Sequence, residues 1–247
     1  MKRFFLYFLI ILTIMIADLP LIWLFSFLHF QIKPSANYSN AIINASMFTI
    51  WAIIHSLLAR KFAKEFMKKI VSENYIKIVY TIIAGITLSL VLFFWQPIPG
   101  VLWQTDGMLY WILTILYIGC IIGMIYETFS TNFLDFLGVR RVLQILKNKP
   151  YKPQAFSTRG LYGYCRHPMD LLFIVAFWMA PVMSYGRLEF AILGTGYFLI
   201  GIIFEERNQH EEYGKIYELY CANVPMWIPR LKPWRYDPEI HYFTMGN

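Results

Sequence analysis

The amino-acid sequence predicts an all-α protein, a polytopic bundle of five to six transmembrane helices. Of the 247 residues, 58% are hydrophobic, 19% are aromatic and only 15% are charged, whereas soluble domains carry about 25% charged residues. The apolar residues gather in long runs, and Lys and Arg lie mainly between alternate runs. Lipid is therefore the expected solvent, and the chain (1–247) is expected to form one integral membrane domain.

Four apolar runs in the N-terminal half approach or exceed the roughly 20 residues that a helix needs to cross a bilayer. They are residues 4–30, 41–58, 76–95 and 108–126. The first run follows Lys2 and Arg3, as a signal peptide would, but it is too long for a cleaved signal and no small-residue cleavage site follows it. It is therefore interpreted as a retained span.

Two shorter apolar runs follow, at 168–183 and 188–204. A helix over the first would be only about 24 Å long, against a hydrocarbon core of about 30 Å. The pair is therefore either two thin or tilted spans or a re-entrant hairpin. Both alternatives place Arg166 and Glu205 at the same membrane face.

The basic residues predict the orientation. Counted by connection, 20 of the 22 Lys and Arg residues fall on one side of the alternating spans. By the positive-inside rule, both termini and both long loops are expected in the cytoplasm. Because the net charge of +7 resides in these loops and not in a stripe with interleaved aromatics, nucleic acid is not an expected partner.

The three cysteines, Cys120, Cys165 and Cys221, form no CxxC pair. Neither a zinc site nor a disulfide framework is therefore indicated, and each is interpreted as a packing residue. Between the fourth and fifth runs, residues 133–147 place apolar side chains loosely at helical spacing. This pattern predicts an amphipathic interfacial segment broken near Gly138, with a solvated linker as the alternative.

The first polar cluster lies in "GLYGYCRHPMDLLF", residues 160–173, directly before an apolar run. His167 precedes Pro168, and proline suits the first helical position while it disfavours helix at the residue before it. A helix is therefore expected to begin at the membrane face, with free N–H groups beside His167. With Arg166, such a place binds carboxylates and phosphates. The alternative is a snorkelling arginine beside an interfacial histidine.

The second polar cluster, "FEERNQHEEYG" (204–214), closes the last apolar run at the same face. Placing the charged side chains of Glu205 and Glu206 there costs free energy unless a cation lies close to them. Arg207 is one candidate for that cation. The other is a bound ligand that offers ribose hydroxyls or a positive centre, and the hairpin would bring the glutamates beside His167.

Tyr162 and Tyr164 lie close to the first cluster. Their aromatic faces would attract a cation such as a sulfonium, although each alone is equally an ordinary interface anchor. A ligand with a carboxylate, a ribose and a cationic sulfur matches the needs of all these groups.

The two clusters resemble the shared pattern of a membrane methyltransferase superfamily that includes isoprenylcysteine carboxyl methyltransferases and phospholipid N-methyltransferases. That pattern is Arg-His-Pro, a glutamate pair, and a downstream Gly-x-x-Tyr-x-x-Tyr-x-x-x-Val-Pro. Here the last part consists of Gly214, Tyr217, Tyr220, Val224 and Pro225. Four further stretches, "HSLLAR", "FWQPIPGVLW", "PYKPQAF" and "AFWMAPVMSYGRL", resemble the methanethiol S-methyltransferase family and its NnrU-like relatives. The resemblance covers about residues 44–232.

The resemblance implies an enzyme that uses S-adenosyl-L-methionine at the cytoplasmic face to methylate a small thiol, methanethiol, to dimethyl sulfide. The cofactor-binding residues that it implies are Gln154, Ala155, Phe156, Ser157, Tyr162, His167, Pro168 and Glu205. The catalytic candidates are Arg166, His167 and Glu206, and no metal is expected. For the general base, His167, Glu206 and bulk water remain open.

In this interpretation residues 1–126 hold four N-terminal spans, 127–232 form the catalytic part with a cytoplasmic-face cofactor pocket, and 233–247 form a tail. The expected partners are the thiol and the lipid bilayer, and the sequence does not predict an oligomeric state. Asp170 stands where the superfamily commonly has a tyrosine, and Arg207-Asn208-Gln209 stands where the closer family has Arg-Asp-Leu.

These departures leave other functions open. One alternative is methylation of prenylcysteine, a phospholipid amine or another thiol, and the other is a non-catalytic NnrU-like membrane protein. Two further polar residues lie inside apolar runs. Asp18 is either functional or paired with His55 or Asn44, and His55 either contacts substrate or is structural.

Overall fold

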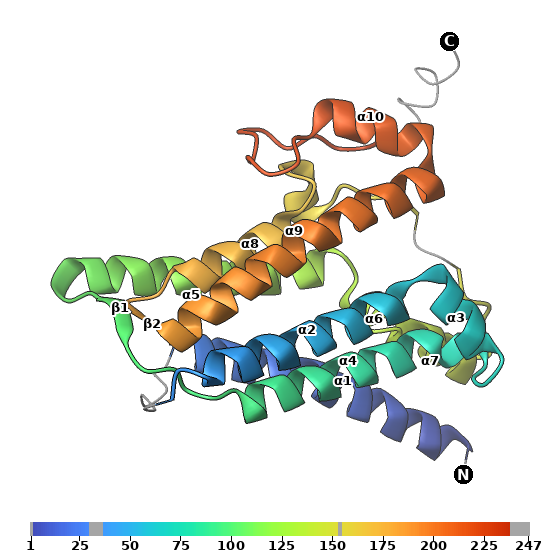
Figure 1. The fold of residues 1–247 in the computed structure, drawn as a ribbon. Helices are drawn as coiled ribbons and strands as arrows, with labels where there is room; N and C mark the ends of the chain where they lie inside the picture. Colours follow the sequence, from blue (N-terminus) through green and yellow to red (C-terminus); the bar gives the residue numbers. More distant parts are fainter. Residues whose placement is uncertain (1, 30–36, 153–154, 238–247) are drawn as a thin grey trace.

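Five helices within the described residues are long and apolar enough to cross a membrane, and they run side by side (Figure 1). The computed structural model describes residues 2–29, 37–152 and 155–237. The five are α1 (Lys2–His29), α2 (Asn40–Ala59), α4 (Ile76–Phe94), α5 (Gly107–Ser130) and α9 (Tyr185–Tyr213). The predicted all-α, multi-pass membrane bundle is confirmed.

The last two apolar runs form a hairpin of unequal helices. α8 (Pro168–Trp178) has 11 residues and α9 has 29. The sequence predicts a helix as far as residue 183, but α8 ends at Trp178. The residue before a proline is disfavoured in helix, and Pro181 follows closely; the chain continues instead as β2 (Val182–Ser184).

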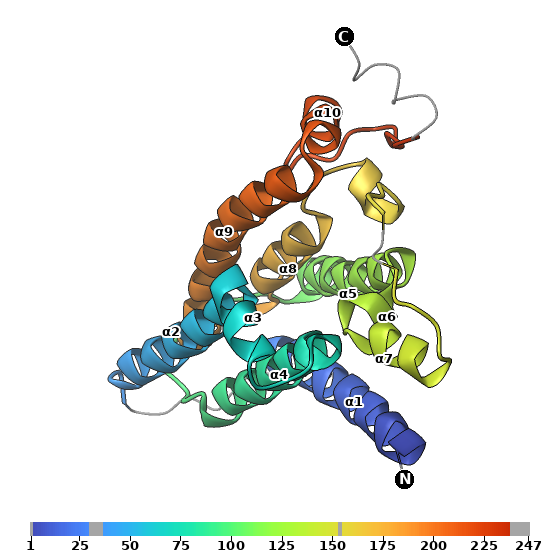
Figure 2. The ribbon, with the colours of Figure 1, turned by 90° about the vertical axis from the view of Figure 1, so that its right-hand side faces the viewer.

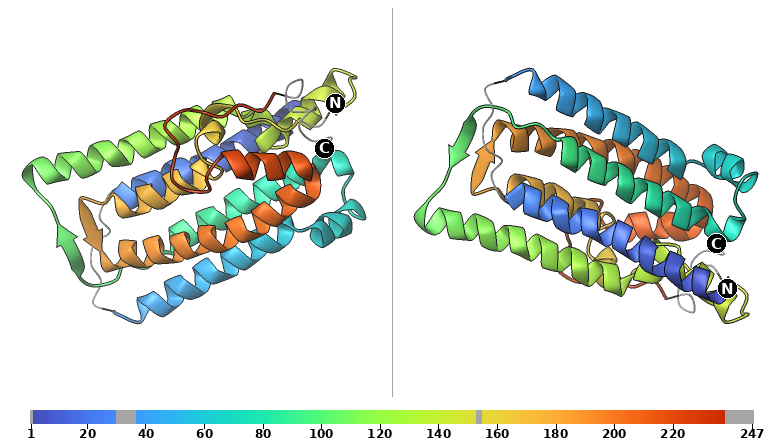
Figure 3. Two further views of the ribbon diagram at one scale, coloured as in Figure 1. Left: turned by 90° about the horizontal axis from the view of Figure 1, so that it is seen from above. Right: turned by 90° about the horizontal axis from the view of Figure 1, so that it is seen from below.

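A small two-stranded ribbon ties this hairpin to the rest of the bundle. β2 pairs antiparallel with β1 (Val101–Gln104), which lies in the connection between α4 and α5. The ribbon lies at the end of the bundle opposite the first turn of α1 (Figure 3). At the other end, Glu205 lies beside His167. The part of α9 from Tyr185 to Glu205 is about 30 Å long. The long arm of the hairpin, α9, is therefore long enough to cross a bilayer, whereas α8 is shorter than a span, and the choice between two spans and a re-entrant hairpin stays a prediction.

Apolar side chains hold the hairpin against the other long helices. α8 packs against α5 and α9, α9 packs against α2, and α4 packs against α1 and α2. The core that they share includes Leu28, Phe48, Trp95, Phe177 and Phe190. Since lipid is as apolar as these residues, close packing of this kind is what associates helices in a membrane.

The end of the bundle away from the ribbon carries short polar helices. They are α3 (Lys61–Lys68), η1 (Glu73–Tyr75), α6 (Phe133–Phe136) and α7 (Val139–Leu146). The predicted break near Gly138 is confirmed: this residue separates α6 from α7 with φ at +77°. Val139 and Val142 are fully buried against Leu6 and Ile78, so the segment is packed on the bundle.

The C-terminal part of the described chain folds back over the end of the α8–α9 hairpin (Figure 2). α10 (Lys215–Asn223) follows α9 after Gly214, whose φ of +52° allows the reversal. Opposite α10 lies η2 (Gly160–Gly163). Tyr217, Tyr220 and Val224 of the expected downstream pattern are buried between these elements.

The polar residues inside the spans have partners other than those expected. Asn44 bonds Gln96 and Glu189, and His55 bonds the hydroxyls of Tyr80 and Tyr197. Among the described residues, Asp18 forms neither an ion pair with His55 nor a hydrogen bond with Asn44, so the alternative that Asp18 pairs with one of them is wrong. His55 joins α2, α4 and α9, which gives it at least a structural role.

Candidate functional site

Backbone contacts hold the Arg-His-Pro segment at the start of α8. Pro168 occupies the first turn of the helix, and His167 is the residue just outside it, as expected. The N–H of Arg166 donates to the carbonyl of Pro225 at 3.0 Å, and the N–H of His167 donates to that of Met226 at 3.4 Å. The chain after α10 therefore fixes both residues at one end of the bundle.

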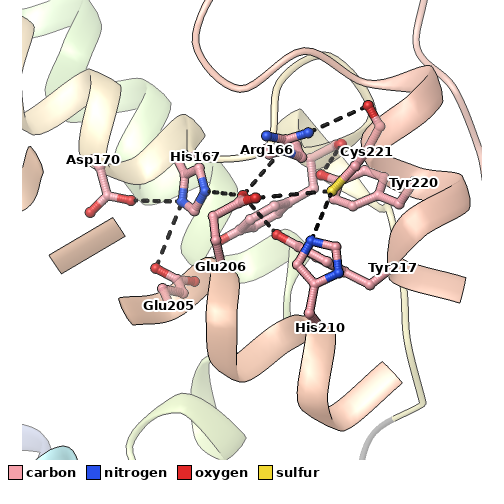
Figure 4. Close-up of polar contacts among 10 residues, drawn as sticks. Arg166, His167, Asp170, Glu205, Glu206, His210, Tyr217, Tyr220 and Cys221 are labelled. Atoms are coloured by element: carbon pink, nitrogen blue, oxygen red, sulfur yellow. Dashed lines mark hydrogen bonds and ion pairs between the residues drawn. The ribbon is translucent and has the colours of Figure 1, made fainter. Parts of the chain in front are cut away.

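Glu206 is the centre of the polar site (Figure 4). Its Oε1 atom lies 2.7 Å from Nε2 of His167 and accepts a hydrogen bond from the Tyr217 hydroxyl at 2.9 Å. The same oxygen forms an ion pair with Nε of Arg166 at 3.1 Å. The two clusters that lie far apart in the sequence are therefore in direct contact. The cation paired with Glu206 is Arg166 and not Arg207.

The other side of the imidazole faces two more carboxylates. Nδ1 of His167 lies 3.5 Å from Asp170 and 3.7 Å from Glu205 (Figure 4). The His167 side chain is only 2% exposed. Burial alone lowers the pKa of His167, but Asp170, the charge of Glu205 and the bond to Glu206 outweigh it and raise the pKa above 6.5. The surrounding carboxylates therefore stabilise the charged form of the imidazole.

Tyr162 reaches the same carboxylates from η2. Its backbone carbonyl accepts a hydrogen bond from the Tyr220 hydroxyl at 2.7 Å, which ties η2 to α10. Burial first, and then the charges of Glu205 and Asp170, raise the pKa of Tyr162. Its hydroxyl therefore stays neutral and remains a hydrogen-bond donor.

The remaining predicted residues lie on the segment that leads to η2. Phe156 packs its ring against Tyr213 of α9 and Tyr220 of α10, so it links the two helices. Ala155 is exposed, and the Ser157 hydroxyl accepts a bond from the N–H of Arg159 at 3.4 Å. Gln154 lies outside the described residues.

Sequence reasoning missed one buried acid beside the site. Glu127 of α5 is fully buried, and one of its oxygens accepts the N–H of Leu161 at 2.5 Å. Gly160 has φ at +60°, and a Cβ there would collide with this carboxylate. The position of a carboxylate directly after the apolar run 108–126 could have indicated this residue. Glu127 supports the η2 turn, which carries Tyr162.

Among the described residues, the site gathers more anionic than cationic groups. Asp170, Glu205 and Glu206 surround two cations, Arg166 and the His167 imidazolium. Such a surplus suits a ligand that carries positive charge, because like charges close together are destabilising unless a cation separates them. Fold and site together define a multi-pass membrane protein with a charged binding site at one end of its helical bundle.

Comparison with known proteins identifies the family. The chain is 34% identical over 191 residues to methanethiol S-methyltransferase 2 of Bradyrhizobium diazoefficiens, which covers 77% of this chain and 73% of the relative. It is 33% identical over 205 residues to the methanethiol S-methyltransferase of Pseudomonas deceptionensis, covering 81% and 77%. A Nurim homolog of Drosophila melanogaster is 24% identical over 193 residues, covering 75% and 76%.

No family model and no solved structure matches the chain. The identity to curated relatives over most of both chains nevertheless shows that the chain belongs to the methanethiol S-methyltransferase family. The family resemblance expected from the sequence motifs is thereby confirmed.

Proposed function

We propose that the protein transfers a methyl group from S-adenosyl-L-methionine to methanethiol and releases dimethyl sulfide. The observation that carries this proposal is the direct contact of His167 and Arg166 with Glu206, beside Glu205 and Asp170. Relatives named methanethiol S-methyltransferase support the acceptor. The positive-inside pattern supports a cytoplasmic site and cytoplasmic termini.

The residues present fit this cofactor. Nδ1 of His167 is buried without a hydrogen-bond partner although two carboxylates lie close to it. The local excess of negative charge matches a molecule that carries both a sulfonium and an ammonium group. The start of α8 offers free N–H groups to a carboxylate, and Glu205 can accept hydrogen bonds from ribose hydroxyls.

In this proposal the site residues act by positioning and by charge. When bound, the cofactor supplies an electrophilic methyl group on a positively charged sulfur. Arg166 and His167 hold Glu206 in place, and Glu205, whose side chain is 45% exposed, remains available to the ligand. Fixed geometry of this kind accounts for much of the rate in a two-reactant displacement.

The geometry argues against a basic role for either candidate side chain. The carboxylates around His167 raise its pKa and so stabilise the charged imidazole, and only the neutral form could accept a proton. Oε1 of Glu206 is already hydrogen-bonded to His167 and to the Tyr217 hydroxyl, and it forms an ion pair with Arg166. We infer that the thiol loses its proton to water, because a neighbouring positive charge lowers the pKa of an acidic group and the thiolate is the nucleophile. The residues of the site would hold the sulfonium of S-adenosylmethionine beside this thiolate, which would take up the methyl group as the cofactor leaves as the neutral thioether.

The proposal is tested with full-length protein purified in detergent. Glu205→Ala should weaken binding of labelled S-adenosylmethionine by about 10- to 150-fold, since a hydrogen bond to a charged group contributes about 1.5–3 kcal/mol. Glu211→Gln, an exposed carboxylate on the same helix, serves as the matched control. Equal affinity of a folded Glu205→Ala protein and the wild type would remove Glu205 from the site.

The acceptor is tested separately. Incubation with S-adenosylmethionine and methanethiol should release dimethyl sulfide into the headspace, measured by gas chromatography. Saturable cofactor binding without dimethyl sulfide would point to prenylcysteine, a phospholipid amine or another thiol as acceptor. A wild-type protein that binds no cofactor would favour a non-catalytic membrane protein.

A further inference from the structure

Three metal-ligating side chains meet on the outer side of Glu206. His210 lies one helical turn after Glu206 on α9, so both side chains share a face. Cys221 comes from α10, which Gly214 folds back against α9. One ligand atom from each of the three residues lies within 4.8 Å of the other two.

The two oxygens of Glu206 face different partners. Oε1 receives His167, Arg166 and Tyr217. Among the described residues, the polar partner of Oε2 is the Sγ atom of Cys221, at 4.0 Å, and Sγ in turn lies 4.0 Å from Nε2 of His210 (Figure 4). Contacts of this length to sulfur are weak. Oε2 therefore retains lone pairs that no strong donor uses.

We propose that Glu206, His210 and Cys221 form a binding site for a divalent cation of the zinc class. Thiolate, imidazole and carboxylate are the three ligand types that Zn²⁺ takes, and tetrahedral coordination at about 2.0–2.3 Å places ligand atoms roughly 3.3–3.8 Å apart. Two of the three observed separations are 4.0 Å and the third is at most 4.8 Å, so the ligand atoms would draw together by up to about 1.5 Å when the ion binds. Three protein ligands leave the fourth position to water.

The site is open to solvent and its ligands are pre-arranged. His210 is exposed, while Glu206 and Cys221 are half-buried. The edge of the His210 ring packs against Tyr217 with ring centroids 4.9 Å apart, which limits its rotation. The sequence spacing does not indicate this site, because three residues separate Glu206 from His210, ten separate His210 from Cys221, and no CxxC pair is present.

The cation site would be linked to the proposed cofactor site, and this step rests on the proposed function. A cation on Oε2 withdraws charge from the carboxylate that holds Arg166 and His167 through Oε1. It also adds positive charge close to a site that is proposed to bind a cation. Zinc should therefore weaken cofactor binding, and the cofactor should weaken zinc binding by the same factor.

Metal binding itself is tested with full-length protein in detergent, without any substrate. Co²⁺ should produce the near-ultraviolet absorption of a thiolate–metal bond, and Zn²⁺ should displace it. Cys221→Ser should abolish this band, and His210→Ala should weaken Co²⁺ binding by more than about tenfold, the loss that even outer-shell changes cause. Cys120→Ser, a buried cysteine in the membrane part of α5, should leave both unchanged.

The same titration also tests the pH dependence. Metal binding must displace the thiol proton, so Co²⁺ affinity should rise with pH. A wild-type protein without the thiolate band, or a band that persists in Cys221→Ser, would overturn the proposal.

The link to the cofactor is measured last. Saturating Zn²⁺ should lower S-adenosylmethionine affinity of the wild type by more than about fivefold, the lower range of allosteric coupling, and should leave Cys221→Ser unaffected. In the presence of a chelator both proteins should bind the cofactor equally. If no cofactor binds to any variant, the proposed function fails while the cobalt spectra still decide the metal site. If Zn²⁺ binds but leaves cofactor affinity unchanged, the linkage is wrong.

Discussion

Asn44 and His167 are both buried polar residues, and they lie toward opposite ends of the bundle. Toward the ribbon end, the amide of Asn44 donates to the carbonyl of Gln96 at 2.9 Å and to Glu189 at 3.0 Å, and its oxygen accepts the N–H of Gln96 at 2.8 Å. At the other end, His167 uses Nε2 for Glu206 and leaves Nδ1 unbonded between two carboxylates.

The difference separates a structural polar residue from a residue of a binding site. Asn44 uses both amide N–H donors and its oxygen, so nothing remains for a ligand. The His167 cluster keeps unused acceptors and an excess of negative charge, which is unfavourable unless a partner supplies the missing cation. Unmet polar requirements, more than burial or charge alone, distinguish the end of the bundle that carries the proposed binding site.

The largest expected effect comes from Glu206→Ala. This change leaves Arg166 and His167 buried without their shared anion, and removal of one partner from a buried ion pair costs about 3–5 kcal/mol. Thermal unfolding in detergent, followed by tryptophan fluorescence, should show a clearly lower midpoint. Glu211→Gln, which breaks an exposed pair with Lys61, should not lower it. Equal midpoints for Glu206→Ala and the wild type would contradict the central role of Glu206.

Asn44→Ala should affect stability without affecting ligand binding. The buried N–H and carbonyl of Gln96 lose their partner, at a cost of about 1–3 kcal/mol for each unsatisfied group. The unfolding midpoint should fall, while the affinity for S-adenosylmethionine, measured at a temperature where the variant is folded, should stay unchanged. A matching loss of cofactor affinity would show that the two ends are coupled.

Gly160→Ala tests whether the turn formed by η2, which is hydrogen-bonded to Glu127, holds Tyr162 at the site. The positive φ and the collision with Glu127 should destabilise the turn by about 1–3 kcal/mol. Cofactor affinity should fall clearly, while the unfolding midpoint of the whole protein should fall only slightly, because only η2 is disturbed. Gly196→Ala of α9, where a new Cβ meets no atom within 4 Å, is the control and should change neither quantity.

The smallest effect is a pH dependence. The folded-state pKa of His167 lies above its ordinary value of 6.5, so the charged imidazole stabilises the fold. This contribution is complete below pH 6.5 and is lost as the pH rises through the folded-state pKa. The unfolding midpoint of the wild type should therefore fall relative to that of His167→Gln between pH 6 and pH 8. A constant difference across this range would show that His167 is not charged.

The sequence predicts the architecture well because its signals are local. Apolar runs and the distribution of Lys and Arg indicate the long helices and place the two polar clusters at one end. The motif residues Arg166, His167 and Glu206 do meet there. Their roles with the cofactor, and the division of the chain at residues 126 and 232, stay predictions.

The remaining features depend on contacts between distant segments. The end of α8 depends on the pairing of β2 with β1. The partners of His55 depend on the arrangement of α2, α4 and α9, and the burial of Glu127 depends on the fold of η2 over α5. No spacing in the sequence indicates these contacts, so the partners of His55 and the burial of Glu127 could not be predicted from composition and periodicity.

The continuity of α9 has a mechanical consequence. The same unbroken helix starts at the ribbon, traverses the apolar layer and carries Glu206 and His210 before it reaches α10. Helices respond to a thinner or thicker bilayer by changing their tilt. Because Glu206 of α9 contacts His167 at the start of α8, a change in the tilt of α9 would move the two halves of this polar cluster relative to each other, so the geometry of the cluster should depend on the thickness of the surrounding lipid.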